Sequence, residues 1–336
     1  MGKNRQDERL GKRKTNASEC VHCHICQKNC DFLSKYKLDI GDRKRLEELA
    51  YHCFLCGRCT EVCPVGIDGR EEILNIRREH SRDNNGQPGE KGYGMLLMEK
   101  KDYLFRNYRN AAGKSALFPG CNFPSFYPKT TKKLVELLKD KTGMGVVYDC
   151  CGKPVAELGM EEQEEKIIHG IEDRLRKHGI TELVTMCPNC YHFLKPRLSV
   201  RVASIYEKLK DLGLGSQIPG DASVFMPCPD REKHKWLEEI RPFFREECTV
   251  LQSVQCCGLG GCAGVKEPEL ARGMAEKLAK EMTENQVVYT YCGSCSGNLA
   301  RNGCKNVQHV LSEILGIHEK PDTGGSMLNR MKTKLW

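Results

Sequence analysis

Short apolar runs alternate with amphipathic stretches over the rear two-thirds of the chain. The runs are Ala116–Pro119, Gly145–Tyr148 and Leu183–Met186, and each lies just before a cysteine. Their length is typical of buried strands. Glu161–His178, between the second and third runs, is amphipathic at helical spacing. Its apolar face carries Ile167, Ile168, Ile171 and Leu175.

A second set of elements repeats this order. Glu267–Glu284 carries Pro268 in its first turn, and its apolar stripe is typical of a helix packed on a core. The stripe consists of Leu270, Met274, Leu278 and Met282. Strands separated by helices pair in parallel through right-handed crossovers. We therefore expect an α/β fold with two duplicated βαβαβα units, each built on a parallel sheet.

Ten cysteines mark the duplication, because those of the first unit recur in the second at offsets of 105 to 107 residues. The two sets are Cys121, Cys150, Cys151, Cys187 and Cys190, and then Cys228, Cys256, Cys257, Cys292 and Cys295. The flanks agree as well, since SALFPGC (115–121) aligns with ASVFMPC (222–228). Open parallel sheets place their sites beyond the carboxyl ends of the strands, so each set should converge on one crevice.

Eight further cysteines form two runs near the N-terminus with the spacing C-x-x-C-x-x-C-x-x-x-C. This is the two-cluster ferredoxin spacing, in which three thiolates of one run and the fourth of the other hold each cubane 4Fe–4S cluster. We expect one cluster on Cys20, Cys23, Cys26 and Cys63, and the other on Cys53, Cys56, Cys59 and Cys30. Pro64 follows the second run as that pattern expects, whereas Asp31 follows the first.

Structural zinc and c-type haem are alternative interpretations of parts of these runs. Structural zinc needs only four ligands in paired sets, and the two runs exceed that need. CVHCH (20–24) matches the attachment pattern of c-type haem, but its cysteines belong to the ferredoxin run and no export signal precedes them. We therefore interpret His22 and His24 as loop residues beside a cluster.

Composition limits the remaining classes of function. The 336 residues are 39% hydrophobic and contain no run of about 18 apolar residues, so we expect no transmembrane segment. The N-terminus lacks an apolar signal region, which favours a reducing cytoplasm where thiolates can hold metal. The net charge of +8 is small for this length, and the basic first 14 residues contain no aromatic side chain, so we expect no nucleic-acid partner.

These patterns divide the chain into six segments. They are a basic flexible tail (1–14), a small α-rich two-cluster ferredoxin domain (15–80), a linker (81–110), the first unit (111–221), the second unit (222–320) and a C-terminal tail (321–336). The linker is placed where Gly, Asn and charged residues replace apolar periodicity.

The rear cysteine pattern resembles the CCG domain of heterodisulfide reductase catalytic subunits. Its spacing is C-x28-CCG-x34-C-x-x-C in the first unit and C-x27-CCG-x33-C-x-x-C in the second. The most specific matches are FPGC (118–121), CCGKP (150–154), CPNCYH (187–192) and CCGLGG (256–261). Together with the ferredoxin front, the chain resembles the D-type subunit, in which both parts are fused.

The resemblance implies that each set of five cysteines is catalytic and holds a noncubane 4Fe–4S cluster. The two clusters would face one another and reduce a small disulfide, such as coenzyme M joined to coenzyme B, with electrons from the two cubanes; the reverse direction is open. The alternative is an electron-transfer subunit of a flavoprotein complex of the glycolate or lactate type. Because no flavin or nicotinamide motif is present, a flavoprotein, a ferredoxin or a membrane cytochrome is expected to supply electrons.

Six residues near these motifs have open roles. Cys248 and Cys304 are interpreted as structural, whereas Cys262, five residues after the second adjacent pair, either packs or approaches a cluster. Three cationic residues near cluster cysteines either offset the charge of thiolate-bound iron or bind an anionic substrate. They are Lys153, His192 and Arg231.

Overall fold

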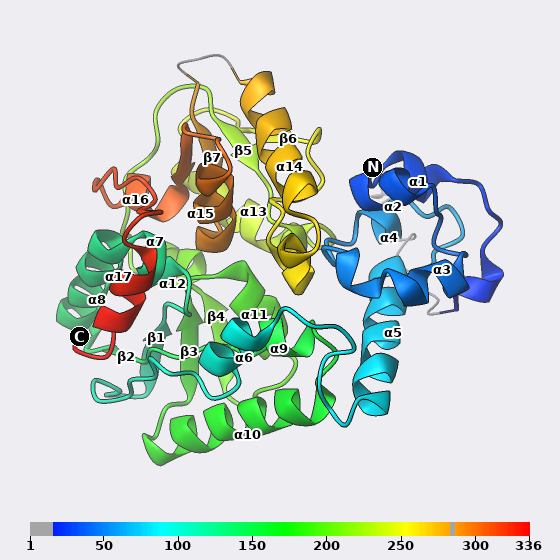
Figure 1. Ribbon diagram of the computed structural model, residues 1–336. Helices are drawn as coiled ribbons and strands as arrows, with labels where there is room; N and C mark the ends of the chain where they lie inside the picture. Colours follow the sequence, from blue (N-terminus) through cyan, green and yellow to red (C-terminus); the bar gives the residue numbers. More distant parts are fainter. Residues whose placement is uncertain (1–15, 283–285) are drawn as a thin grey trace, which may run out of the picture.

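The computed structural model describes residues 16–282 and 286–336, which form a helical N-terminal domain and two α/β units (Figure 1). The helices of the N-terminal domain are α1 (Ile25–Lys28), α2 (Asp31–Tyr36), α3 (Arg43–Glu48), α4 (Arg58–Glu61) and α5 (Gly69–Asp83). A separate apolar core that includes Phe32, Ile40 and Ile73 holds them together. The expected α-rich domain is confirmed, while the tail expected over 1–14 lies outside the described residues.

The first unit is a four-stranded, fully parallel sheet in the order β2-β1-β3-β4. Along the chain it contains β1 (Ser115–Phe118), α7 (Phe123–Phe126), α8 (Pro128–Thr142), β2 (Gly145–Val146), α9 (Lys153–Ala156), α10 (Glu161–Lys177), β3 (Glu182–Thr185), α11 (Pro188–Leu194), β4 (Arg201–Ser204) and α12 (Ile205–Asp211). Ala116 and Leu183 are fully buried, so the paired strands form the centre of the unit.

The second unit repeats this sheet in the order β6-β5-β7-β8, again with every pair parallel. It contains β5 (Ser223–Phe225), α13 (Lys235–Ile240), β6 (Thr249–Leu251), α14 (Pro268–Glu281), β7 (Val288–Thr290), α15 (Gly293–Arg301), β8 (Val307–His309) and α16 (Val310–Ile314). Because the two sheets have the same strand order, the predicted duplication and the α/β class with parallel sheets are confirmed.

Each sheet nevertheless has one strand more than the predicted βαβαβα order. The additional strands are β4 and β8, which follow the helix after the third strand. In β4 only Val202 and Ala203 are apolar, so its apolar run is too short to stand out in the sequence. The predicted strand Gly145–Tyr148 is shorter than expected, because Tyr148 leaves the sheet and forms an antiparallel bridge with Asn107.

The two predicted amphipathic helices are present. α10 ends one residue before the predicted end, with Ile171 and Leu175 fully buried. α14 begins at Pro268 and ends at Glu281, whereas the predicted end at Glu284 lies outside the described residues. Among the described residues, no helix combines the length and the apolar character needed to cross a bilayer.

The segments expected as a linker and a C-terminal tail are folded against the rest of the protein. α6 (Gly94–Lys100) lies within 81–110, and the buried Tyr103 and Phe105 follow it. α17 (Ser326–Lys332) lies within 321–336 and packs against α7. Both helices border the cavity described below, so neither segment serves only as a connection or an end.

Candidate metal centre

The second cysteine run of the N-terminal domain gathers around the turn that begins α4. Gly57 caps this helix with φ 75°, a left-handed conformation that glycine adopts without strain. Cys30, from the first run, lies among these thiols. Its burial, together with the charges of the neighbouring Cys56 and Cys53, raises its pKa. Burial, followed by the charge of Cys30, raises the pKa of Cys59. The four thiols predicted to share one cluster therefore lie together.

The first run is closer to solvent. Cys23 is exposed, Cys20 and Cys63 are half-buried, and Cys26 is buried. Burial raises the pKa of Cys26, with a smaller contribution from the charge of Cys20, which places these two thiols near each other. The sulfur of Cys63 accepts a hydrogen bond from the backbone N–H of Ile67 at 3.3 Å. An electron donor in solution would therefore reach this run more easily than the second.

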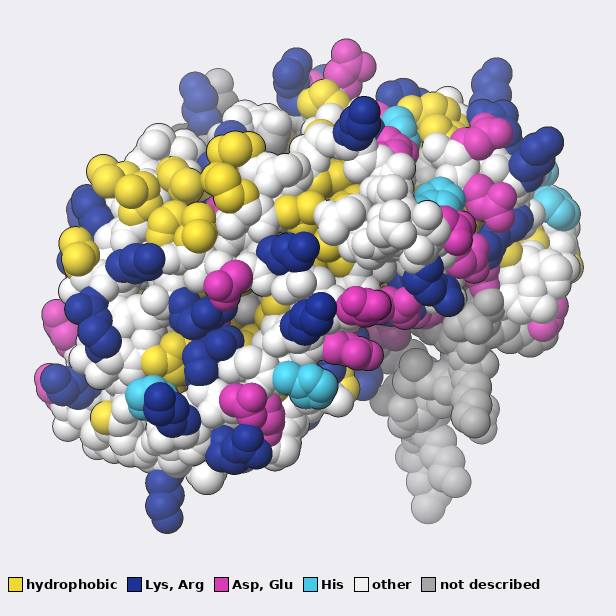
Figure 2. All heavy atoms as spheres, turned by 60° about the horizontal axis from the view of Figure 1, so that its bottom comes forward, with side chains coloured by type: hydrophobic (Ala, Val, Ile, Leu, Met, Phe, Trp, Pro, Cys, Tyr) yellow, Lys and Arg dark blue, Asp and Glu magenta, His cyan; other side chains and the backbone are white. Residues whose placement is uncertain are grey.

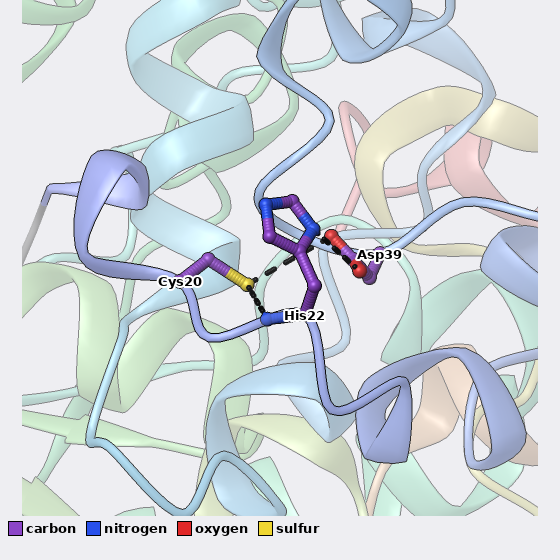
Figure 3. Close-up of side chains that lie close together, drawn as sticks. All are labelled: Cys20, His22 and Asp39. Atoms are coloured by element: carbon purple, nitrogen blue, oxygen red, sulfur yellow. Dashed lines mark hydrogen bonds and ion pairs between the residues drawn. The ribbon is translucent and has the colours of Figure 1, made fainter.

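Two histidines of the first run lie against one buried carboxylate. His22 and His24 have left-handed backbones, with φ 49° and 57°, and their Nδ1 atoms lie 3.0 and 3.1 Å from Oδ2 of Asp39. The sulfur of Cys20 lies 3.8 Å from the other oxygen of Asp39 (Figure 3). Cys20, His22 and Asp39 have the atom types of a metal site. Since Cys20 belongs to the ferredoxin run, we interpret this group as the edge of the cluster site.

The five cysteines of the first unit form one buried row of thiols. Contacts run from Cys121 to Cys150, Cys151, Cys190 and Cys187 in turn. Hydrogen bonds from Cys150 and Cys190 lower the pKa of Cys151 to about 5. Thiolates are the form of cysteine that binds iron, so this packing favours a metal site with several sulfur ligands.

The second unit contains the matching row. It runs from Cys228 to Cys256, Cys257, Cys295 and Cys292 in turn. Hydrogen bonds from Cys256 and Cys295 hold the pKa of Cys257 well below its ordinary value. Cys257 thus occupies the position in its row that Cys151 occupies in the first, as the duplication leads one to expect.

Two further contacts join these rows to each other and to the N-terminal domain. The Cys187 and Cys292 thiols are hydrogen-bonded across the two units. A hydrogen bond with Cys256 lowers the pKa of Cys56 to about 6. Sequence reasoning missed both contacts, because each pair is separated by more than 100 residues and no local motif signals it. The result is one continuous row of thiols from Cys56, through the second unit, to Cys121.

Polar contacts fix the N-terminal domain beside the second unit. Gln255, just before Cys256, accepts from the Asp31 backbone N–H at 2.9 Å and donates to the Cys30 sulfur at 3.7 Å. Arg231 donates to Glu61 at 3.0 Å across the same boundary. One of the three open cationic residues is thereby placed between a ferredoxin cysteine loop and Cys228.

Glu267, at the start of α14, is the most heavily bonded carboxylate of this boundary. It is 1% exposed and accepts from three residues of the N-terminal domain. The partners are Lys35 at 2.6 Å, the Tyr36 hydroxyl at 2.6 Å and the His52 ring at 2.7 Å. Burial alone would raise the pKa of Glu267, but these partners lower it. The ionised carboxylate therefore stabilises the folded protein above its unfolded pKa of about 4.3, and this stabilisation is lost as the pH falls.

Glu267→Gln is accordingly expected to weaken the boundary at pH 7. The loss of charge-assisted hydrogen bonds should reduce the free energy of unfolding by about 1.5–3 kcal/mol. Anaerobic thermal unfolding would measure the difference. Glu269→Gln, at an exposed position of the same helix, is the control. Equal melting temperatures for the two variants would contradict this role of Glu267.

Within the described part of the chain, a larger and a smaller cavity reach the thiol rows. The larger, of about 630 Å³, is lined by cysteines of both units, including Cys121, Cys187 and Cys257. Methionines lie at its rim, and Figure 2 shows hydrophobic side chains gathered on one face of the molecule. The exposed ones that line the cavity are Met95, Met98, Leu104, Leu259, Val265 and Met327. A smaller cavity of about 370 Å³ meets it at Lys153 and Cys228.

The other residues whose roles the sequence left open lie either in the lining of a cavity or in the core. His192 lines the smaller cavity, with Nε2 3.4 Å from Oδ1 of Asp230. Cys262 lines the larger cavity, and burial raises its pKa to about 12. Cys248 and Cys304 are buried among apolar side chains, which agrees with a structural role.

Comparison with protein families matches all three parts of the chain. Residues 16–67 match the 4Fe-4S dicluster domain, and residues 115–195 and 223–300 each match the cysteine-rich domain CCG. The two family models together cover most of the chain. Their matched residues fall, in order along the chain, in the N-terminal domain, the first unit and the second unit. The units that carry the thiol rows are therefore CCG domains.

Several relatives can be aligned with much of this chain. The D-type subunit of dihydromethanophenazine:CoB–CoM heterodisulfide reductase from Methanosarcina acetivorans is 25% identical, over 76% of this chain and 74% of that protein. Lactate utilization protein A 1 from Bacillus mycoides is 25% identical, over 60% of this chain and 97% of that protein. An uncharacterized iron–sulfur protein from Methanococcus maripaludis is 26% identical, over 76% of this chain and 57% of that protein.

Several archaeal relatives are longer than the region they share with this chain, which spans 57 to 66% of three of them. The matched domains nevertheless carry all eighteen cysteines of the predicted cluster motifs. The chain belongs to the iron–sulfur proteins that join a 4Fe–4S dicluster domain to two CCG cysteine-rich domains, and its relatives include the D-type subunit of heterodisulfide reductase.

Proposed function

We propose that this chain is the subunit of an oxidoreductase in which electrons pass from two cubane clusters to two noncubane clusters and reduce a disulfide. The observation that carries the proposal is the continuous row of thiols from Cys56 to Cys121. The row crosses the domain boundary once and the boundary between the units once. A route of this form gives electrons a path that does not leave the protein.

The proposed ligands are the eighteen cysteines of the motifs. The cubanes would be held by Cys20, Cys23, Cys26 and Cys63, and by Cys53, Cys56, Cys59 and Cys30. The noncubane clusters would be held by Cys121, Cys150, Cys151, Cys187 and Cys190, and by Cys228, Cys256, Cys257, Cys292 and Cys295. Bound iron–sulfur clusters supply sites that accept and release one electron at a time.

The chain's own residues would bring the substrate to the thiol rows. The larger cavity opens where both CCG domains contribute cysteines, so a disulfide there can approach both rows at once. Its apolar rim limits the access of water to the reacting sulfur atoms. Reduction breaks one S–S bond and consumes two electrons and two protons, giving two thiols. The electrons come from a redox partner of the flavoprotein, ferredoxin or cytochrome class, and the coenzyme M–coenzyme B disulfide is one candidate substrate.

A second candidate function is electron relay without disulfide chemistry. The similarity to lactate utilization protein A, over 97% of that protein, favours a subunit that serves a flavoprotein dehydrogenase. The complete pair of cysteine rows favours disulfide chemistry, because both rows reach the same cavity. The two functions differ in whether a disulfide is turned over.

Metal content and turnover test the proposal in sequence. Anaerobically purified protein is expected to contain about 16 iron and 16 acid-labile sulfide per chain, with little zinc. With a viologen as artificial reductant, the same sample should reduce a small disulfide to two thiols. About 8 iron would mean that only the N-terminal domain holds clusters, and the proposal would fail. Full iron content without disulfide turnover, together with rapid oxidation by a flavoprotein, would support the relay.

A further inference from the structure

Two helices outside the matched domains form a wall of the larger cavity. α6 and α17 lie outside 16–67, 115–195 and 223–300, yet both contribute residues to the cavity lining. Each places methionine at the rim and one cation deeper in the wall. The cations are Lys100, which is 7% exposed, and Arg330.

The two cations share a single carboxylate. Nζ of Lys100 lies 2.7 Å from Oε1 of Glu99, and one guanidinium nitrogen of Arg330 lies 2.7 and 2.9 Å from the two Glu99 oxygens. Nε of Arg330 is buried and has no hydrogen-bond partner among the described residues. One negative charge therefore lies between two positive charges, which leaves this corner of the cavity with a surplus of about one positive charge.

Both cations lie beside the thiols of the first unit. Arg330 donates to Oδ1 of Asn122 at 3.0 Å, and Asn122 directly follows Cys121. Nζ of Lys100 lies 4.9 Å from the ring centroid of Tyr103, which packs in one buried cluster with Cys121. A charge this close to a buried thiolate interacts strongly with it, because little water screens the pair.

A second carboxylate of the first unit is likewise shared by two cations. Asp149, just before Cys150, is 1% exposed, and its Oδ2 lies 3.2 Å from both Arg106 and Arg174. Arg106 also pairs with Asp102, whose side chain is 86% exposed and therefore screened by solvent. In each of these two groups, one largely buried carboxylate lies between two cations.

The second unit lacks this surplus. Around Cys228 the charges balance. Arg58 and Arg231 share Glu61, at 2.8 and 3.0 Å, but Lys153 pairs with Glu157, and Arg70 lies beside the charges of both Asp68 and Glu232. Arg272 and Arg301, which line the larger cavity from this unit, are exposed, so solvent screens their charges. Asp230, two residues after Cys228, is fully buried and accepts from the Tyr291 hydroxyl at 2.8 Å. The backbone N–H groups of Trp236 and Leu237 also donate to Asp230, and Nε2 of His192 lies 3.4 Å from it. The field at the second unit is therefore less positive than at the first.

We propose that Lys100 and Arg330 make the first unit the stronger electron acceptor of the two, so that electrons entering from Cys56 to Cys256 run downhill to Cys121. The inference rests on the proposed function, because it requires a cluster in each unit. An added electron is a negative charge, and fixed cations stabilise it, which raises the local reduction potential. Lys100 and Arg330 act on the thiol-bound site through space, and are tuning residues rather than reacting groups.

Redox titration of the holoprotein, followed by EPR, tests this charge effect with variants of opposite sign. Lys100→Met removes a positive charge and should move the transition of the first unit to more negative potential. Glu99→Gln removes a negative charge beside the same thiols and should move it to more positive potential. We expect each change to alter the electron distribution between the units about tenfold, which corresponds to ~59 mV for one electron. The first unit's transition is identified as the one that Cys257→Ala retains.

Lys101→Met, at the exposed position next to Lys100, is the matched control and should shift no transition. Shifts of opposite sign for Lys100→Met and Glu99→Gln, confined to the first unit, support the proposal. Unchanged potentials, or a change only in the KM for an anionic disulfide, would overturn it and make Lys100 a substrate-binding residue. Absence of all transitions beyond those of the cubanes would instead refute the proposed function itself.

Discussion

Cys257→Ala is expected to abolish disulfide reduction while leaving the N-terminal domain able to take up electrons. Cys257 contacts both Cys256 and Cys295 at the middle of the second row, so its loss should prevent cluster assembly there. Iron should fall from about 16 to about 12 per chain. Because the second unit stands between Cys56 and the first unit, reduction of the first unit should also become slow. Iron analysis and stopped-flow reduction would measure both effects.

Cys151→Ala is the matched comparison, because it removes the equivalent thiol of the first row. It should also lose about four iron and turnover, yet the second unit should still be reduced at the normal rate. The electron source should be a reduced ferredoxin, which is too large to enter a 630 Å³ cavity. Equal reduction of the remaining unit in the two variants would refute the order in which the units receive electrons.

Arg77→Met is expected to destabilise the protein by weakening the contacts among its three domains. Arg77, on α5, is fully buried and donates five hydrogen bonds to backbone carbonyls. The acceptors are Ala50 at 3.0 and 2.8 Å, Cys53 at 2.7 Å, Glu157 at 2.7 Å and Gly261 at 2.7 Å. Removing one partner of a buried charged interaction costs roughly 3–5 kcal/mol, because the remaining polar groups are left unpaired, and we expect a loss of stability of about that size.

The same variant should slow electron transfer more than cluster assembly. Arg77 ties the Cys53 loop of the N-terminal domain to both CCG domains, and a misplacement of about 1 Å can lower a rate up to 100-fold. Differential scanning fluorimetry, iron content and disulfide turnover, measured on one sample, would separate these effects. Arg82→Met, on the same helix but 66% exposed, should change none of them. Full turnover in Arg77→Met would show that the domains stay in register without this residue.

Cysteine spacing made most of the candidate site predictable, because a ligand run is a local feature. The duplication needed only five recurring cysteines and their apolar flanks. Less local features were missed. The strands β4 and β8 are too short to produce a periodic signal, and α6 lies in a stretch whose Gly and charged residues indicate a linker. The burial of Tyr103 beside Cys121 is similarly invisible, because its partner is distant in sequence.

The sequence by itself determined which residue types are available and in which local groups: two ferredoxin runs, two CCG sets and the strands that precede them. The tertiary structure decided which groups meet. It placed Cys56 against Cys256 and Cys187 against Cys292, and it brought Lys100 and Arg330 beside Cys121 of the first unit. The physical reason is range. Ligand spacing and periodicity act over a few residues, whereas these contacts depend on how separately folded domains pack, through residues such as Arg77 and Glu267.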